Sequence, residues 1–468
     1  MLLDIEITDD QLIISYYNVE GRVEFKTYPT ADLFNWQVCE PTDKRKDKTF
    51  INWDGRPVKK FKGKSINKHV IFNFLENLPK EDADAIFGYN FPKTYFFDIE
   101  TEVTEGFPHA EKAENRVLTI SILTPEKKVL VMGLRDLEKS DQADIIKKTN
   151  EYFKKFNANF ELVFKKFDSE YDLLYTFMAM VKKFPMLTGW NCIGFDWKYL
   201  VNRCKRLQID PSISSPSGKL DKKSTLPLHV GIIDYMDLYA NWDRTITIKD
   251  NNKLETAAVA VIGVGKIKYD GNLQTLYDDD YIKYVYYNIV DSILVYYIDQ
   301  KLKSMQNLLT LSNTCKISLY KAGSPVAITE SLIARHLIAD NRVMASKWDD
   351  DNKKDGQYAG AFVKPPIVGK HRAVACFDYA SLYPSIMRQY NISPDSFIKK
   401  LPSTKIESFR KENVGVNIVT SSGAVYKTEQ SILKTVLSDL YSKRKEYKKE
   451  SFRYKMLVAK VSDKLKKM

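Results

Sequence analysis

Between Tyr95 and Leu302, strand-like and helix-like stretches alternate along the chain. The strand-like runs are TYFFDIE, RVLTISIL, KVLVMGL and MLTGWN. The helix-like runs are EYDLLYTFMAMVKKF, FDWKYLVNRCKRL and DDYIKYVYYNIVDSILVYYIDQKL. An alternation of this kind buries its apolar faces as a sheet covered by helices. We therefore predict an α/β domain in this part of the chain.

Carboxylates occupy distinctive places in these runs. Asp98 and Glu100 stand two residues apart on a predicted strand, so both side chains emerge on one face and repel each other unless a cation lies between them. Asp196 follows a strand that ends at Asn191, and a glycine-bearing loop delivers it to the start of a helix. Taken singly, the first two are also compatible with exposed strand-end acids, and Asp196 with an acid favoured by the helix macrodipole.

A further carboxylate lies in the most apolar helical run. Tyr287 and Asp291 are four residues apart, which places them on the same face of a helix. A buried Asp291 is costly unless it is paired, bound to a metal or satisfied by a hydrogen bond in the core. Together, four carboxylates and a tyrosine meet the needs of two Mg²⁺ or Mn²⁺ ions, with Tyr287 orienting the attacking water.

Composition narrows the class of protein. A chain of 468 residues is long enough for about three domains. Its net charge is +12, and residues 443–468 hold eleven basic and three acidic residues, a local excess of eight that favours a polyanion such as nucleic acid. The five cysteines form no C-x-x-C pair, which favours a reducing cytoplasm. The chain starts with acidic residues and has no long apolar run, so we expect neither a signal peptide nor a membrane span.

Three motifs in the middle of the chain resemble the 3′→5′ proofreading exonuclease of family B DNA polymerases: D-x-E in FDIET, N-x2–3-[FY]-D in NCIGFD, and Y-x3-D in YNIVD. Further along, the apolar run AVACFD predicts a strand that ends at Asp378. It leads into DYASLYPS, which is similar to motif A of that family, and YAGAFV is similar to the family's Y-x-G-[GA] element. RQYNISPDS, GFPHAEKAENRVLTISI and DYMDLY look like the T-even phage branch. The resemblance covers nearly the whole chain from Tyr95 onward.

The resemblance implies roles for single residues. Asp98, Glu100, Asp196, Tyr287 and Asp291 would form the exonuclease site. In the polymerase half-site, Asp378 would bind both catalytic metals, so that each active site uses two Mg²⁺ or Mn²⁺ ions. The backbone carbonyl of Tyr379 would also bind metal, the main chain of Ser381 and Leu382 would bind the triphosphate, and Tyr383 would select against a 2′-hydroxyl. Arg444 and Lys448 would contact the triphosphate as well. Tyr358 and Gly360 would contact the template strand.

The resemblance also implies a multidomain α/β fold. It consists of a β-rich N-terminal domain (1–94), a ribonuclease H-like exonuclease domain with a mixed sheet flanked by helices (95–303), a helical connector back to the N-terminal domain (304–350), a partial α/β palm with motif A (351–429) and the helical start of the fingers (430–468). The family also needs K-x3-N-S-x-Y-G and Y-G-D-T-D-S, which this sequence does not contain.

These observations predict one chain of a split DNA polymerase in the cytoplasm of a phage-infected bacterium. It would act on a DNA primer-template and deoxynucleoside triphosphates together with a second chain, which carries the remaining palm, fingers and thumb and contacts the sliding clamp. A truncated polymerase is the other explanation. Two further alternatives are a stand-alone 3′→5′ exonuclease with a vestigial palm, and an RNA-binding translational regulator that uses the basic stretch from Lys44 to Lys64 with Phe50, Trp53 and Phe61.

Overall fold

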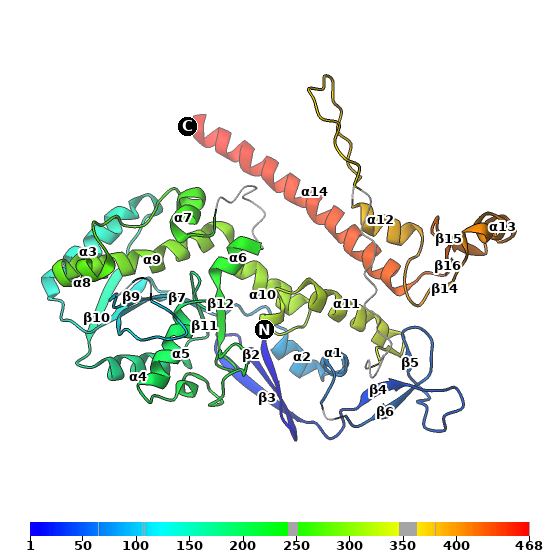
Figure 1. Ribbon diagram of the computed structural model, residues 1–468, viewed down its shortest axis with the longest axis horizontal. Coiled ribbons are helices and arrows are strands. Elements are labelled where there is room, and N and C mark those ends of the chain that lie inside the picture. Colours follow the sequence, from blue (N-terminus) through cyan, green and yellow to red (C-terminus); the bar gives the residue numbers. More distant parts are fainter. Residues whose placement is uncertain are drawn as a thin grey trace. The chain divides into compact units, whose positions relative to one another are not determined.

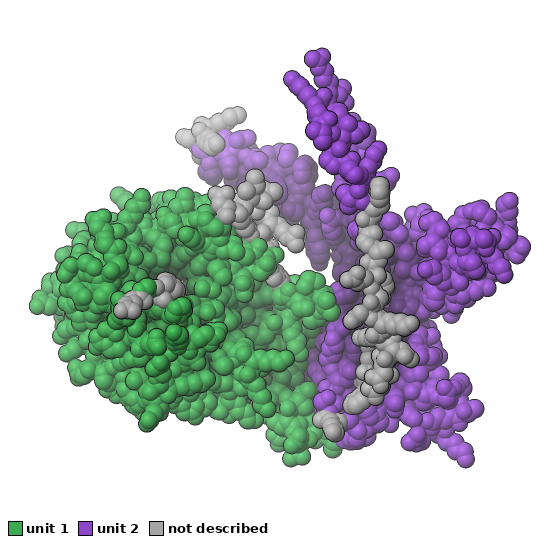
Figure 2. Space-filling model, in the orientation of Figure 1, with its two compact units in different colours: residues 1–31, 78–328 green, residues 32–77, 329–468 purple. Residues whose placement is uncertain are grey.

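The computed structural model describes residues 1–468 except 64, 105, 107, 242–250, 346–362, 380 and 468, and except the side chains of 466 and 467. The described chain forms two compact units (Figure 2), the first made of Met1–Ala31 and Leu78–Ile328 and the second of Asp32–Asn77 and Thr329–Met468. The mixed α/β class predicted from the sequence is confirmed. The domain boundaries stay predictions.

A six-stranded mixed sheet is the frame of the first unit (Figure 1), and its strand order is β10-β9-β8-β7-β11-β12. The strand β7 (Thr94–Thr101) is antiparallel to β8 and parallel to β11. The other strands are β8 (Val117–Leu123), β9 (Lys128–Gly133), β10 (Glu161–Lys166), β11 (Met186–Gly189) and β12 (Gly231–Asp234). The four strand-like runs of the sequence lie in β7, β8, β9 and β11, so those predictions are confirmed.

The two faces of β7 bury different side chains, as period-two alternation requires. Phe97 and Ile99 join an apolar core with α4 (Glu170–Val181) and α5 (Asp196–Arg206). Asp98 and Glu100 point to the other face, where α9 (Tyr281–Leu302) packs on β7 and β8. The helices that surround α9 are α3 (Lys139–Tyr152), α7 (Leu254–Ile262) and α8 (Leu273–Asp279).

The first strands of the chain pack in the same unit. The strands β1 (Leu2–Ile7), β2 (Gln11–Tyr17) and β3 (Val23–Pro29) form an antiparallel meander, which confirms the predicted hairpin or meander. The buried His229, which precedes β12, contacts Ser15 Oγ through Nδ1 and Glu6 Oε2 through Nε2, both at 3.0 Å. This contact ties the meander to the edge of the six-stranded sheet. The helices α2 (Lys80–Ile86), α6 (Tyr235–Asn241) and α10 (Ser304–Thr314) complete the unit.

The second unit combines short sheets with helices. Its elements are β4 (Asn35–Val38), β5 (Ile51–Asn52), β6 (Val58–Phe61), α1 (Lys68–Glu76), α11 (Pro325–Ala339) from Thr329 onward, β13 (Arg342–Val343), α12 (Leu382–Gln389), β14 (Phe397–Lys400), α13 (Ile406–Glu412), β15 (Asn417–Val419), β16 (Ala424–Lys427) and α14 (Ile432–Lys467). The strand pairs β4–β6 and β5–β13 pack around Trp36, Val58, Val70 and Val343. Ile333 and Leu337 of α11 pack on Ile432 and Val436 of α14. The basic helix predicted from Gln430 onward is confirmed by α14.

The prediction of a strand in AVACFD, whose last residue is Asp378, is wrong. Residues 373–378 form neither strand nor helix, and Val374 and Phe377 are 76% and 92% exposed. A strand needs a neighbour that satisfies its backbone N–H and C=O groups, and no strand in the described part of the chain pairs with this segment. Apolar composition alone therefore misled the prediction.

Among the described helices, none combines the length and the apolar character that crossing a membrane requires. All five cysteines are free thiols.

Candidate metal centre and active site

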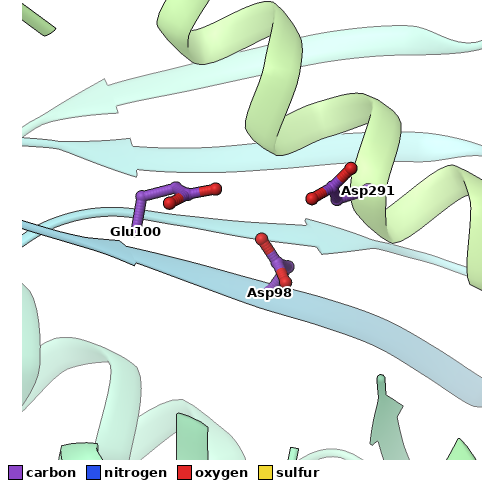
Figure 3. Close-up of side chains that lie close together, drawn as sticks. All are labelled: Asp98, Glu100 and Asp291. Carbon is purple, nitrogen blue, oxygen red and sulfur yellow. The ribbon is translucent and has the colours of Figure 1, made fainter. Parts of the chain in front are cut away.

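Three carboxylates converge between β7 and α9. Asp98 and Glu100 come from β7 and Asp291 from α9, and one ligand oxygen of each lies within 4.8 Å of the others. Figure 3 shows the three groups turned toward a common space. Asn288, one turn before Asp291, donates from Nδ2 to Asp98 Oδ2 at 2.8 Å, which fixes Asp98 against the helix. Period two thus puts Asp98 and Glu100 on one face of β7, and the packing of α9 on that face brings Asp291 to them.

Burial and mutual repulsion raise the pKa values of these three carboxyl groups. Burial first, and then Glu100, Asp196 and Asp291, hold the pKa of Asp98 well above its usual range. Burial and Asp291 raise the pKa of Glu100 to about 8, and burial also raises the pKa of Asp291. The Oδ1 atom of Asp291 is buried without a hydrogen-bond partner. Clustered oxygens, raised pKa values and an unpartnered ligand atom fit a hard divalent cation, so the triad can hold a metal.

Asp196 lies in the same cavity but outside this group of three. It is the first residue of α5, and its Oδ1 accepts a hydrogen bond from the Ile99 N–H at 3.1 Å. Burial raises its pKa to about 7 against the opposing effect of that hydrogen bond. The backbone bond fixes the carboxylate beside the strand that carries Asp98 and Glu100.

A second carboxylate, which the sequence analysis did not single out, shapes the loop that delivers Asp196. Asp234 accepts hydrogen bonds from the N–H groups of Ile193 and Met236, both at 3.0 Å. Burial raises its pKa to about 6. Asp234 begins the DYMDLY stretch, whose resemblance to the T-even phage branch says nothing of this contact. No spacing rule links Asp234 to the loop about forty positions earlier.

Lys266 is the other functional candidate that the sequence analysis missed. Its Nζ lies 2.6 Å from Asp291 Oδ2 and 4.7 Å from the centre of the Tyr287 ring. Burial lowers the pKa of Lys266, but the neighbouring Asp291 and Tyr287 raise it by more, so the net shift is upward. The sequence signal for Lys266 is weak, because GVGK follows a short apolar run and no spacing relates it to Asp291.

Tyr287 lies one helical turn before Asp291, as predicted. A hydrogen bond from its hydroxyl lowers the pKa of Asp291, opposing the effect of burial. The ring packs edge-on against Tyr269, with 5.3 Å between centroids. This phenol therefore sits beside the carboxylate cluster in a fixed orientation.

These groups line a cavity of about 900 Å³, in which the carboxylates share the wall with Trp190, Asn191, Phe195 and Tyr269. The wall also includes Val103, Thr104, Gly106 and Pro108, from the segment that follows β7. Aromatic and polar side chains beside acidic residues suit a nucleotide better than a purely apolar ligand.

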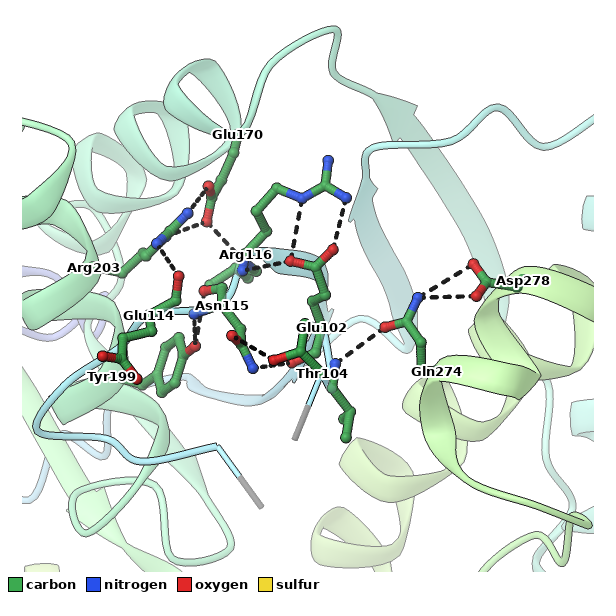
Figure 4. A network of polar contacts seen from close by, with 12 residues as sticks. Glu102, Thr104, Glu114, Asn115, Arg116, Glu170, Tyr199, Arg203, Gln274 and Asp278 are labelled. Atoms are coloured by element: carbon green, nitrogen blue, oxygen red, sulfur yellow. Dashed lines mark hydrogen bonds and ion pairs between the residues drawn. The ribbon is translucent and has the colours of Figure 1, made fainter. Parts of the chain in front are cut away.

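A polar network holds that segment (Figure 4). Gln274 of α8 accepts a hydrogen bond from the Val103 N–H at 3.0 Å, and Arg116 pairs with Glu102 at 2.9 Å. Nearby, Arg203 of α5 binds Glu170 through two nitrogens at 2.7 and 2.8 Å, and Glu170 also accepts from the Val117 N–H at 2.8 Å. The wall of the cavity is thus anchored to helices on both faces of the sheet.

The residues of the predicted polymerase half-site are mostly exposed. Asp378 lies in the unpaired segment before α12, and Tyr379 and Tyr383 are 77% and 74% exposed. Ser381, with φ of 53°, caps the amino end of α12, which begins at Leu382. Arg444 and Lys448 are exposed on α14, and within the described residues no hydrogen bond or ion pair joins them to the start of α12. Tyr358 and Gly360 lie outside the described residues.

The described part of the basic stretch from Lys44 to Lys64 is partly neutralised by acids in or next to it. Lys59 and Arg45 pair with Asp43, and Arg56 pairs with Asp54. Its aromatic side chains Phe50, Trp53 and Phe61 are half-buried. RNA binding through this stretch stays a prediction, without added support from the structure.

Two family models match the chain. The model of the DNA polymerase family B exonuclease domain matches residues 67–256, and the model of DNA polymerase family B matches residues 316–461. The chain belongs to DNA polymerase family B. Tyr287, Asp291 and Lys266 fall between the two matched stretches, so their place in this family B chain rests on the geometry described above.

Curated relatives agree with the family. The DNA-directed DNA polymerase of Escherichia phage RB69 is 28% identical over 385 residues, which are 75% of this chain and 41% of that protein. The DNA-directed DNA polymerase of Enterobacteria phage T4 is 28% identical over 317 residues, which are 63% of this chain and 34% of that protein. A DNA polymerase of Archaeoglobus fulgidus is 23% identical over 88% of this chain and 46% of its own length. The chain thus spans less than half the length of these relatives.

Proposed function

We propose that the first unit is a 3′→5′ exonuclease with a ribonuclease H-like fold, which removes nucleotides from the end of a single DNA strand. The observation that carries this proposal is the convergence of Asp98, Glu100 and Asp291, from two separate motifs, into one group of oxygens within 4.8 Å. Asp196, from a third motif, lines the same cavity.

The proposed chemistry is metal-assisted hydrolysis. Two Mg²⁺ or Mn²⁺ ions would supply a hydroxide at neutral pH and stabilise the leaving oxygen of the phosphodiester. Asp98, Glu100, Asp196 and Asp291 would hold these ions, and the hydroxyl of Tyr287 would orient the attacking water. Trp190 and Phe195 in the cavity wall provide ring faces against which an unpaired base can stack.

Replacing Asp98 and Glu100 together by alanine tests this assignment. The double variant should lose at least about 10³-fold of the metal-dependent release of nucleotides from single-stranded DNA, because no oxygen ligands remain on β7. The matched control is Glu161→Ala with Asp168→Ala, which removes two exposed carboxylates of the same unit and should retain full activity. Undiminished hydrolysis by a purified double variant would refute the proposal.

For the second unit we propose half of a DNA polymerase site. Asp378 and the Tyr379 carbonyl would bind metal, Ser381 and Leu382 would present N–H groups to a triphosphate at the start of α12, and Tyr383 would exclude a 2′-hydroxyl. Arg444 and Lys448, one turn apart on α14, would contact the same triphosphate. Tyr358 and Gly360 would contact the template strand.

We propose that a second polypeptide supplies the remaining palm, fingers and thumb, and through them the sliding-clamp contact. Support comes from the large apolar side chains exposed around motif A, since patches of this kind mark surfaces that another protein segment covers. They are Val374, Phe377, Tyr379, Leu382 and Tyr383. The complete enzyme would then extend a DNA primer on a template from deoxynucleoside triphosphates.

A further inference from the structure

One basic side chain is built into the carboxylate cluster. Two lysines line the described part of the cavity, and Lys253 is exposed at its rim. Lys266 instead reaches inward, where its ammonium group pairs with Asp291 Oδ2 at 2.6 Å over the face of the Tyr287 ring. The Asp291 side chain in this pair is only 4% exposed.

The backbone around Lys266 is held from three directions. Its N–H donates to the carboxylate of Glu255 at the start of α7. The Tyr152 hydroxyl donates to the Gly265 carbonyl at 3.0 Å, and Lys155 Nζ donates to the Ile262 carbonyl at 2.7 Å. A Cβ at position 265 would lie 2.5 Å from Glu255 Oε1, so a side chain there would displace the carboxylate that accepts from the Lys266 N–H. Lys266 is therefore positioned by the fold and is not a surface lysine that happens to reach a carboxylate.

The two oxygens of Asp291 have different surroundings. Oδ2 pairs with the ammonium group, whereas Oδ1 is buried without a hydrogen-bond partner. The carboxylate as a whole lies next to those of Asp98 and Glu100. One oxygen is thus compensated by a resident positive charge, and the other remains available to a metal. An ammonium group so close to a metal ligand repels a divalent cation while it offsets the repulsion among the carboxylates.

We propose that Lys266 is a resident counter-ion of the exonuclease carboxylates, which stabilises the protein without metal and lowers its affinity for divalent cations. The inference rests on the proposed metal site, but it concerns the tuning of that site and not the cleavage step. Because Lys266 already neutralises part of the negative charge, a higher free metal concentration is needed to occupy the site.

Mn²⁺ binding to the full chain, followed by the electron paramagnetic resonance signal of free Mn²⁺, tests the proposal. Lys266→Met should bind Mn²⁺ at least about tenfold more tightly than the wild type, because a positive charge next to a ligand is removed. Lys266→Gln, which keeps a donor for Asp291, should show the same gain, whereas Lys266→Arg should stay close to the wild type. The matched control Lys268→Met removes an exposed lysine from the same segment and should change nothing.

Thermal unfolding gives the second readout. In a chelator, Lys266→Met should melt below the wild type, and added Mn²⁺ should narrow or reverse that difference. Unchanged or weaker Mn²⁺ binding by both Lys266→Met and Lys266→Gln would overturn the counter-ion role. A wild type that binds Mn²⁺ no better than the Asp98→Ala, Glu100→Ala variant would instead show that the metal site itself is wrong, so the two failures are distinguishable.

Discussion

At the scale of single residues, Glu100 shows how an apolar frame changes the chemistry of a carboxylate. In water a glutamate releases its proton near pH 4.3, at about the reference value. On β7 under α9, burial and the nearby Asp291 raise the pKa of Glu100 to about 8. Near neutral pH, a cation that bound at this site would therefore displace a proton from Glu100.

This shift predicts how stability depends on pH without metal. Between about pH 4.5 and pH 8 the folded protein keeps a proton on Glu100 that the unfolded chain has released, so the contribution of Glu100 is lost as pH rises through this window. In a chelator, Glu100→Gln should therefore gain melting temperature relative to the wild type as pH increases from 5 to 8.5. Differential scanning fluorimetry measures the difference, and a difference independent of pH would contradict the shift. With Mn²⁺ added, the wild type should recover at the alkaline end.

At the scale of elements, the long apolar α9 carries two residues of the candidate site, Tyr287 and Asp291. It is buried along most of its length, which fits a helix that is apolar all round. Ser121 of β8 donates to the Asn288 carbonyl at 3.0 Å and lies 2.6 Å from Ser292 Oγ, so polar contacts as well as apolar packing fix the helix on the sheet. The position of Asp291 over β7 follows from this docking.

On the face of the sheet opposite α9, the packing of α4 and α5 depends on a buried ion pair. Arg203 and Glu170 have side chains only 11% and 8% exposed, and they join α5 to α4 and to the start of β8 (Figure 4). Arg203→Met should lower the free energy of unfolding by about 3–5 kcal/mol, because it leaves Glu170 buried without its counter-charge. Urea unfolding measures the loss.

Two comparisons make that prediction specific. Adding Glu170→Gln to Arg203→Met should restore part of the stability, since the uncompensated charge is gone. Arg206→Met, three residues further along the same helix at a half-exposed pair, should cost no more than about 1 kcal/mol. Equal losses for Arg203→Met and Arg206→Met would show that burial does not govern this contact.

At the scale of the whole molecule, the two units differ in how complete they are. The residues that line the cavity of the first unit all belong to that unit. The second leaves the motif A segment without a strand partner among the described residues and leaves apolar side chains of α14 exposed, including Phe452, Leu457 and Leu465. Exposed apolar surface of this kind marks either an interaction site or an aggregation-prone surface.

Mixing this chain with a polypeptide that carries K-x3-N-S-x-Y-G and D-T-D should restore template-directed primer extension. The chain alone should extend no primer, because Asp378 is the single carboxylate among the half-site residues proposed above. Complex formation should also protect the amides of residues 373–379 from hydrogen exchange, since the segment would gain strand partners. The control is Asp378→Asn, which should form the complex without extending a primer. A tight one-to-one complex of the wild type that extends no primer would rule out the split site.

The sequence by itself determined features that depend on short spacing. Period two in β7 put Asp98 and Glu100 on one face, and four-residue spacing in α9 put Tyr287 above Asp291, because backbone geometry alone fixes where neighbouring side chains point. The alternation of apolar runs likewise predicted the covered sheet. The same local logic failed at residues 373–378, where strand formation requires a partner that no local pattern reveals.

Only the tertiary structure decided which distant groups meet. Lys266 reaches Asp291 because Glu255 and Tyr152 hold its turn against α9, and Asp234 shapes the Asp196 loop because β12 lies beside β11. These contacts join segments that no periodicity relates. Their formation depends on which helix faces and strand edges pack together, and the raised pKa values follow from the burial that this packing creates.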